Sequence, residues 1–175
     1  MRRMFLSAVV VAVAVGLLVA ATGGAQNPGQ GQGQGRSFVT YEKATGGSFR
    51  FVDAKPFTRM TDQGPRRVSA GDAFIVRSTT YSDPATTQKV GTFRVHCLAT
   101  NGARRFDRVT FMCNGVDSYA DGTVAFRGVF RPTEPATIVI AVLGGTGAYE
   151  GASGQIISED PVEGPTKNTV HLVTG

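Results

Sequence analysis

Hydrophobic and polar residues alternate in many short segments of this chain, and a two-residue period is typical of half-buried β-strands. From Arg36 onward, no segment keeps the period of an amphipathic helix. The expected strands cover residues 38–42, 48–53, 72–78, 90–100, 106–116, 124–130, 137–143, 155–159 and 169–174. Many short strands separated by turns are typical of a sandwich or a barrel, so we predict an all-β fold.

The dipeptides Asp121-Gly122 and Asn101-Gly102 mark tight turns between these strands. Asp and Gly tolerate the positive φ of a type I′ turn, so Asp121-Gly122 predicts a hairpin between strands 106–116 and 124–130. Asn101-Gly102 is expected to form a similar turn in the preceding hairpin.

The two cysteines lie on the strands that flank Asn101-Gly102. The apolar face of the first strand carries Phe93, Val95 and Cys97, and that of the second carries Val109, Phe111 and Cys113. If Cys97 lies opposite Cys113, the two apolar faces coincide, as the pleat of a sheet requires. We therefore predict a cross-strand disulfide, which would close a loop of about 15 residues and stabilise the fold by roughly 3 kcal/mol.

The segment TIVIAVL at 137–143 is apolar on both faces of its strand. In a barrel, one face of a strand looks into the lumen and the other looks outward. An outward apolar stripe must be covered by a loop or by another subunit. We therefore expect a homo-oligomer.

The N-terminal residues have the pattern of a secretory signal peptide, which we place at 1–25. Arg2 and Arg3 precede an apolar run at 5–21, and Gly23-Gly24-Ala25 supplies the small residues of a cleavage site. A retained membrane anchor is the alternative, because about 17 apolar residues are marginally long enough to span a bilayer. We expect cleavage, a secreted or cell-envelope location, and no stable membrane span afterwards.

A segment rich in Gly and Gln follows at 26–36 and contains no apolar residue, so we predict a flexible linker. The remaining residues, 37–175, are enough for one domain with its own core.

Charge and composition exclude two further classes of function. Removing the two arginines of the signal peptide from the 18 basic residues leaves 16 against 13 acidic ones, a net charge of about +3. No aromatic residue is interleaved with the basic doublets Arg66-Arg67 and Arg104-Arg105, so no nucleic-acid partner is expected. The chain has two Cys and two His, and we expect neither a metal site nor another cofactor.

A cluster of glycines follows the long apolar strand and suggests, at first, a nucleotide-binding loop. A dinucleotide site needs the spacing G-x-G-x-x-G followed by a helix. Here Gly145 and Gly147 are followed by Gly151, one residue too late, and the next residues predict a strand. We expect Gly144, Gly145, Gly147 and Gly151 to form a tight structural turn, with Tyr149 packed against the barrel wall.

The same stretch, GGTGAYEGASGQ at 144–155, closely resembles the glycine-rich turn of the allene oxide cyclase and dirigent superfamily. Four segments upstream resemble bacterial members with this barrel, in the same order: FRFVDAK at 49–55, AGDAFIV at 70–76, VGTFRVHC at 90–97 and DGTVAFRG at 121–128. The resemblance covers roughly residues 38–158. It implies an eight-stranded antiparallel β-barrel with an apolar lumen, and a trimer or dimer, since plant members are commonly trimeric.

The resemblance also implies a kind of chemistry. Plant allene oxide cyclases close an unstable epoxide, dirigent proteins steer the coupling or cyclisation of phenolic intermediates, and some bacterial barrels form rings in polyketides, all without a cofactor. We therefore predict an exported barrel that binds a small apolar or phenolic molecule and steers its cyclisation or coupling by confinement. A non-catalytic carrier and a cell-envelope barrel filled with side chains remain alternatives.

Glu42 is the candidate catalytic residue, because Tyr41-Glu42 resembles the first strand of the plant cyclases, where a Glu lies in the lumen. The Asn expected two residues later is Ala44, and a bridged Cys97 offers no free thiol, so plant-type allene oxide cyclase activity is not expected. The candidate ligand-binding residues are Tyr41, Phe51, Phe74, Phe93, Phe111 and Phe126.

A hydrolase is not expected. Ser118, His171 and Asp117 could form a triad only with a strained G-x-S-x-G turn, which the chain lacks. His96 and His171 are both expected to face solvent.

Overall fold

The computed structural model describes residues 34–54, 60–61, 64–65, 67–132 and 136–174. These residues all fall within Gly31–Gly175. The predicted signal peptide and the linker up to residue 33 lie outside the described residues. Among the residues described, no helix is long and apolar enough to cross a membrane.

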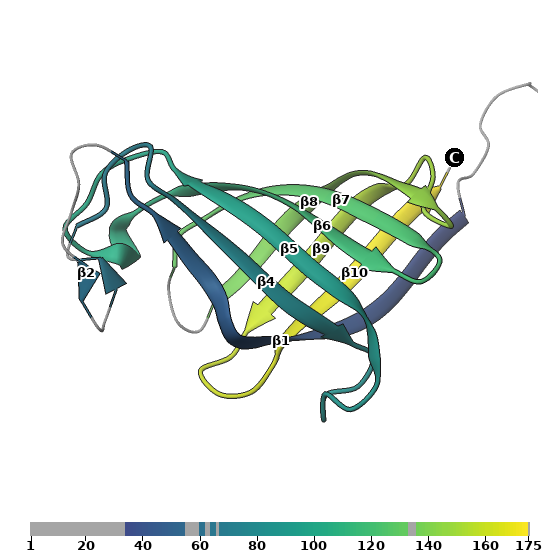
Figure 1. Cartoon of the computed structure of the whole chain (residues 1–175). Coiled ribbons are helices and arrows are strands. Elements are labelled where there is room, and N and C mark those ends of the chain that lie inside the picture. The colour runs from purple at the N-terminus through teal and green to yellow at the C-terminus, as the bar shows by residue number, and fades with distance from the viewer. Residues whose placement is uncertain (1–33, 55–59, 62–63, 66, 133–135, 175) are drawn as a thin grey trace, which may run out of the picture. The chain divides into compact units, whose positions relative to one another are not determined.

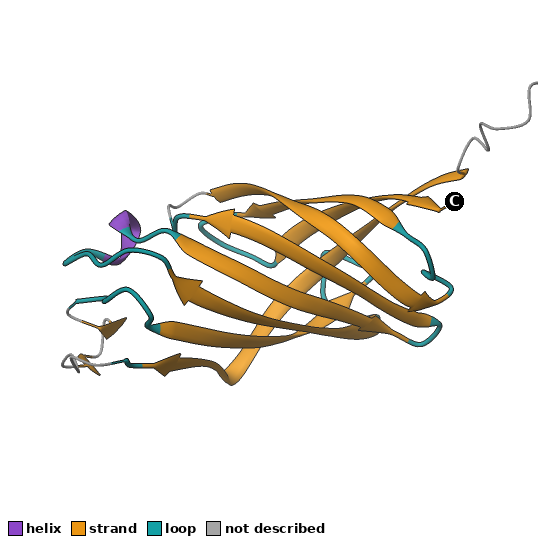
Figure 2. Ribbon diagram, turned by 90° about the horizontal axis from the view of Figure 1, so that it is seen from above, coloured by secondary structure: helices purple, strands orange, loops and turns teal. Residues whose placement is uncertain are grey.

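Eight strands close into one antiparallel barrel, in the order β1-β10-β9-β8-β7-β6-β5-β4 (Figures 1 and 2). They are β1 (Gln34–Val52), β4 (Ala73–Tyr81), β5 (Lys89–Ala99), β6 (Phe111–Tyr119), β7 (Gly122–Phe130), β8 (Ala136–Gly147), β9 (Ser153–Asp160) and β10 (Thr166–Thr174). A separate two-stranded sheet pairs β2 (Met60–Thr61) with β3 (Gly64–Pro65), and a single 3-10 turn, η1, covers Phe106–Arg108. The predicted all-β, eight-stranded barrel is confirmed.

Several predicted boundaries were wrong. The strands expected at 38–42 and 48–53 are one strand, β1, whose pairing with β4 shifts register between Ala44 and Phe49. The sequence predicts that the domain begins at residue 37. The strand begins earlier, at Gln34, which already pairs with Thr174. The strand expected to begin at Phe106 begins later because η1 occupies its first residues.

The hairpin between β6 and β7 is confirmed, but its turn is not type I′. Tyr119 pairs with Gly122, so Ala120 and Asp121 are the two turn residues. Asp121 is not among the non-glycine residues with a positive φ, whereas Gly122 has φ +155°. The sequence predicts a positive φ at both Asp121 and Gly122. In the structure only Gly122, which follows the two turn residues, has one.

The predicted disulfide is confirmed between directly opposed residues of β5 and β6. Cys97 pairs with Cys113 in the strand register, with 4.0 Å between their Cα atoms, and both side chains are buried. Val95 then opposes Gly115, and Phe93 opposes Asp117. The odd-numbered positions of β5 and β6 therefore face the lumen together.

Candidate functional site

A cavity of about 210 Å³ lies in the lumen of the barrel. Apolar side chains of β4–β8 form most of its wall, and polar groups from β1, β9 and β10 complete it. The lining residues are Glu42, Phe74, Val76, Phe93, Val95, Cys97, Cys113, Phe126, Gly128, Phe130, Ile138, Ile140, Ser158, Asp160 and Thr166. A cavity of ~150 Å³ holds benzene, so this one has room for a single ring with small substituents.

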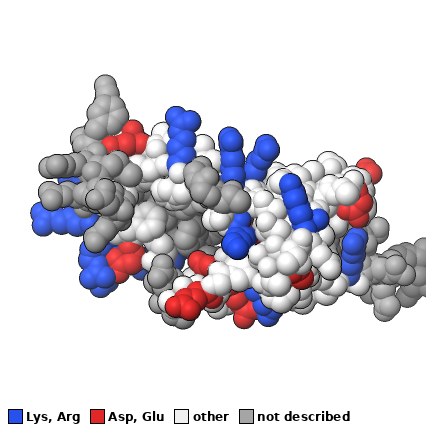
Figure 3. All heavy atoms as spheres, turned by 60° about the horizontal axis from the view of Figure 1, so that its bottom comes forward, with Lys and Arg blue, Asp and Glu red and all other residues white. Residues whose placement is uncertain are grey.

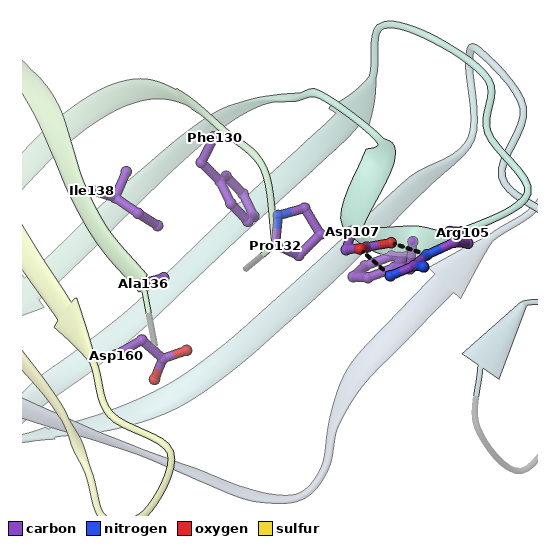
Figure 4. A pocket seen from close by; sticks show the side chains of 8 residues that line it. Arg105, Asp107, Phe130, Pro132, Ala136, Ile138 and Asp160 are labelled. Carbon is purple, nitrogen blue, oxygen red and sulfur yellow. Dashed lines mark hydrogen bonds and ion pairs between the residues drawn. The ribbon is translucent and has the colours of Figure 1, made fainter. Parts of the chain in front are cut away.

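The cavity opens at one end into a wider pocket of about 740 Å³. Phe130, Ile138 and Asp160 line both spaces, so they mark the passage between them. Figure 4 shows these three residues around the opening, with the Arg105–Asp107 ion pair at its far side. A bound molecule could therefore place one ring in the lumen and extend a further group into this outer pocket.

Aromatic rings pack beside the passage. Phe111 is fully buried, and its ring centroid lies 4.9 Å from that of Phe74, 5.3 Å from that of Phe106 and 5.8 Å from that of Phe130. We call these four residues the rim cluster. They fill the lumen on the β4–β7 side of the opening and leave the cavity free behind it.

Deeper in the lumen lies a group of inward-facing polar side chains that we call the polar layer. All of its members except Glu42 are less than a tenth exposed. The layer consists of Thr40, Glu42, Ser78, Thr80, Asp117, Ser158 and Asn168.

Glu42 occupies the part of this layer that faces the cavity. Its Oε1 accepts a hydrogen bond of 2.5 Å from Asn168 Nδ2, and its Oε2 accepts one of 3.3 Å from Ser78 Oγ. Neither ion pair found among the described residues includes Glu42. Burial, and then the nearby charge of Asp117, raises the pKa of the Glu42 carboxyl well above its ordinary value.

Asp117 is the second carboxyl of the layer. It is 4% exposed, and its strand positions it between Phe93 of β5 and Val124 of β7. Its Oδ1 is buried without a hydrogen-bond partner. Burial raises the pKa of Asp117 to about 7. The phenol of Tyr119, two residues along, also has a raised pKa because of burial and the charge of Asp117.

Two carboxyl groups that interact in a poorly solvated space cannot both ionise easily, so the pair retains a proton that isolated carboxyls would lose. A group with a pKa near the working pH is suited to give or take a proton during a reaction. The arrangement of Glu42 and Asp117 is therefore chemically able to protonate a molecule in the cavity and to recover the proton.

The structure brings together most of the residues that the sequence singles out. Glu42, Phe74, Phe93 and Phe126 line the cavity, and the rings of Phe93 and Phe126 stack with centroids 5.5 Å apart. Phe111 packs in the rim cluster and is not a lining residue. Phe51 is half-buried opposite Phe74, at the edge of the core.

Tyr41 is placed differently from the prediction. It lies between Thr40 and Glu42, both of which face the lumen, and neighbouring residues of a strand point to opposite sides. Its strand partners are Tyr81 and Lys167. Tyr41 therefore belongs to the outer face of β1 and does not line the lumen.

The glycine-rich segment continues β8 to Gly147, and the turn itself covers 148–151. Gly147 and Gly151 have φ of +62° and +69°, a left-handed conformation that side chains disfavour. Tyr149 is buried against Phe38 and Tyr119 at this end of the barrel, with 5.5 Å between the two tyrosine ring centroids. Gly144 and Gly145 lie within the strand rather than in the turn.

Sequence reasoning missed Asp117 and Asn168 as members of the site. A signal for both was present. Asp117 shares the odd-numbered face of Phe111 and Cys113, and Asn168 precedes the buried Val170 at the spacing of one strand face. By contrast, Ser118 and His171 lie on the opposite faces of their strands, so no triad forms with Asp117; His171 Nδ1 is instead 2.8 Å from Ser37 Oγ. Within the described part of the chain, no group of three or more His, Cys, Asp or Glu residues could hold a metal ion.

No protein-family model matches the chain, and no curated protein matches it. Solved structures do. A pyocyanin demethylase superposes with a TM-score of 0.61 at 19% identity, covering 79% of this chain and 100% of that one. The pterocarpan synthase dirigent protein PsPTS1 gives 0.59 at 14% identity, covering 83% and 97%. This chain has the dirigent-type barrel fold.

A third structure, AbnU, an exo-specific intermolecular Diels-Alderase, gives a TM-score of 0.51 at 14% identity and covers 80% of this chain and 98% of that one. The resemblance to the dirigent and allene oxide cyclase barrels is thus confirmed at the level of the fold. At these identities the likeness does not extend to the site residues.

Proposed function

We propose that the barrel binds a small, ring-containing apolar or phenolic molecule in its lumen and steers its cyclisation by proton transfer to and from Glu42, whose pKa the nearby Asp117 helps to raise. The observation that carries this proposal is the position of Glu42, a poorly solvated carboxyl on the wall of an otherwise apolar cavity, hydrogen-bonded by Asn168 and Ser78. Apolar cavities with a few convergent polar groups and perturbed pKa values are the usual form of active sites.

The polar layer supports a catalytic role over a passive one. Burying carboxyl groups that lack a cationic partner is unfavourable, and Asp117 Oδ1 is left without a hydrogen bond. A carrier or a filled structural barrel would be more stable with apolar residues at these positions. The fold neighbours add weight, since a demethylase, a pterocarpan synthase and a Diels-Alderase all process small molecules.

In the proposed reaction, a protonated Glu42 gives its proton to an oxygen of the bound molecule, which makes the attached carbon electrophilic. A double bond of the same molecule attacks that carbon and closes the ring. The cation that results then loses a proton to the Glu42 carboxylate, so the protein is regenerated and the product is an isomer of the substrate. Phe93 and Phe126 would hold the reacting chain in a folded conformation.

Coupling of two phenols would in addition need an oxidant from outside the barrel. Cyclisation is therefore the reaction that the site supports best, and coupling would be limited to steering intermediates that are already oxidised.

We also propose that the mature barrel is exported and forms a homo-oligomer through the outer face of β8. The buried disulfide suits an oxidising compartment. Val139 and Leu143 are 58% and 59% exposed on that face, and Ala141 lies exposed between them. An uncharged apolar stripe of this kind favours burial against another subunit.

The test is to incubate the protein, purified from its host after export, with extracts of the same host in heavy water. Cyclisation changes chromatographic retention without changing elemental composition, and turnover is expected to be slower than in ordinary water, because the Glu42 carboxyl then carries deuterium. Glu42→Gln is expected to retain binding of the same molecule by native mass spectrometry and to lose turnover at least 100-fold. Glu150→Gln, an exposed loop carboxyl, is the matched control.

Three outcomes would change the conclusion. Equal turnover by the Glu42→Gln variant would remove the proposed proton transfer. Binding without turnover by the unaltered protein would indicate a carrier. The absence of any bound molecule, together with no binding of phenol or 2-naphthol, would indicate a structural barrel.

A further inference from the structure

The outer wall formed by β1 and β4–β7 carries positive charge and no negative charge. Four arginines and two lysines project from it, accompanied by a histidine, and all seven are exposed: Lys43, Arg50, Arg77, Lys89, Arg94, His96 and Arg127. The two acidic residues within these strands, Glu42 and Asp117, both face the lumen. Figure 3 shows Lys and Arg side chains standing out along one side of the barrel, apart from most Asp and Glu.

The arginines of this wall have few partners among the described residues. Arg77 lies directly opposite Arg94 on the neighbouring strand, an arrangement of like charges that destabilises a sheet. Arg50, Arg77 and Arg94 make no hydrogen bond or ion pair within the described part of the chain, and Arg127 donates only to Asn114 Oδ1, at 2.7 Å. Their positive charge is left available to an external anion.

A surface hollow of about 490 Å³ runs between these side chains. Arg77, Arg94, His96, Asn114 and Ser118 contribute its polar lining, together with neighbouring aliphatic groups. The hollow could hold an anionic group within reach of two arginines.

An apolar row runs across the same wall beside the basic residues. The strand register aligns Val52, Ala73, Leu98, Met112 and Val129 across five strands. Val52, Leu98 and Val129 are 44%, 36% and 60% exposed. The next outward row along the strands contains the basic residues Arg50, His96 and Arg127.

This apolar row lies at the open end of the lumen. Val129 immediately precedes Phe130, which lines both the lumen cavity and the outer pocket. Contact made through the apolar row would therefore bring the contacting surface close to the opening.

We propose that this outer wall, which we call the basic wall, docks on an anionic phospholipid bilayer. Arg50, Arg77 and Arg94 would contact lipid phosphates while Val52 and Leu98, on the same side of the barrel, enter the boundary between headgroups and acyl chains. Basic residues beside an exposed apolar row are the features that bind a protein to such a surface. A second copy of the chain fits less well, because a symmetric contact would bring arginine against arginine. A nucleic acid would leave the apolar row unused.

Docking in this orientation places the opening of the lumen beside the bilayer, where apolar molecules concentrate. The inference does not depend on the proposed reaction, since the basic wall and the lumen residues are separate sets. It would explain how a barrel with so small a cavity meets a poorly soluble molecule.

The experiment is co-sedimentation of the exported protein with vesicles of phosphatidylcholine alone and of phosphatidylcholine mixed with phosphatidylglycerol. We expect the protein to bind only the mixed vesicles, and we expect added salt to weaken that binding. Arg94→Gln should weaken it about fivefold, and Arg77→Gln with Arg94→Gln about 25-fold, since each basic residue near an anionic surface contributes a comparable increment. Lys167→Gln is the control, because Lys167 lies on β10 and pairs with Glu159.

A second pair of variants tests whether vesicle binding depends on the apolar row or on any exposed apolar residue. Val52→Ser should weaken vesicle binding, whereas Val173→Ser, at nearly equal exposure on β10, should not. The proposal is overturned if the protein ignores anionic vesicles, binds neutral ones equally well, or loses as much with Lys167→Gln as with Arg94→Gln. It is also overturned if Val52→Ser leaves vesicle binding intact but dissociates an oligomer in size-exclusion chromatography.

Discussion

The rim cluster and the polar layer lie in the same lumen, but the first consists of packed apolar rings and the second of buried polar groups. In the rim cluster, Phe111 is fully buried and its ring packs against three other phenylalanine rings. In the polar layer, Asp117 Oδ1 and Thr80 Oγ1 are buried with no hydrogen-bond partner. One region stabilises the barrel, and the other lowers its stability.

The difference supports placing the proposed function in the polar layer. Apolar packing of the first kind is what any eight-stranded barrel of this size needs to fill its interior. Two interacting carboxyls of the second kind are unfavourable for folding, and such groups concentrate at sites that do chemistry. The polar layer is therefore the region of the lumen to alter when function is tested, and the rim cluster is the region to alter when stability is tested.

The largest expected effect comes from the rim cluster. Phe111→Ala should reduce the free energy of unfolding by about 3–5 kcal/mol, because it removes a fully buried ring and leaves a cavity. Urea denaturation followed by circular dichroism measures the loss. Phe49→Ala is the control, since Phe49 stacks on Phe74 but is 50% exposed and should matter much less. Similar losses for both variants would mean that the rim cluster is not the stabilising region.

The disulfide should come next, because it joins β5 and β6, which supply residues to both regions. Replacing Cys97 and Cys113 by Ala together should reduce the free energy of unfolding by roughly 3 kcal/mol, as expected for a loop of this length. The bridge spans a sequence separation of 16 residues. Denaturation midpoints with and without a reductant provide the measurement. If the double variant remains sensitive to reductant, the bridge is not the cause of the difference.

The barrel and its register could be predicted because both depend on local patterns. Alternation located nearly all of the barrel strands, and the two cysteines fixed the pairing of β5 with β6. Extending that register further along the two strands places Asp117 opposite Phe93 in the lumen. The sequence thus contained the position of the second carboxyl, although an isolated Asp on a strand is more often a solvated one.

Other features of the site depend on contacts that no local pattern contains. That Asn168 hydrogen-bonds Glu42 follows from the closure of the barrel, which brings β10 beside β1. The exclusion of Tyr41 from the lumen follows once Glu42 is known to face inward. Whether the aromatic residues would fill the lumen or leave a cavity depended on ring packing, in which the rim cluster gathers to one side.

The pH dependence of stability also distinguishes the polar layer from the rim cluster, because only the polar layer contains carboxyl groups. A carboxyl whose pKa is raised on folding keeps its proton better in the folded state, so stability is greatest at acidic pH and falls as the pH rises. For Asp117, with a pKa of about 7 in the folded protein, the fall should occur between pH ~4 and ~7. Its slope should reach about 1.4 kcal/mol per pH unit for one proton.

Asp117→Asn should flatten that slope and raise stability at neutral pH relative to the unaltered protein. Asp107→Asn is the matched control, because Asp107 lies on the surface, partly exposed, and its hydrogen bond from Arg105 lowers its pKa, which gives the opposite sign. Denaturation at a series of pH values provides the data. An unchanged slope in Asp117→Asn would mean that the carboxyl pair does not hold the extra proton.

The smallest expected effect tests the polar layer without touching a charge. Thr80 is fully buried, and its Oγ1 has no hydrogen-bond partner in the described structure. Thr80→Val keeps the shape and removes the hydroxyl, so it should raise the free energy of unfolding by about 0.5–1 kcal/mol. Ser78→Ala is the contrasting variant, because it deletes a donor to Glu42 and should lower stability slightly. If Thr80→Val is instead destabilising, the Thr80 hydroxyl is hydrogen-bonded to a water molecule in solution. The polar layer then has more hydrogen-bond partners than its side chains alone provide. If it stabilises as expected, the layer holds a polar group that folding does not need, as the comparison with the rim cluster requires.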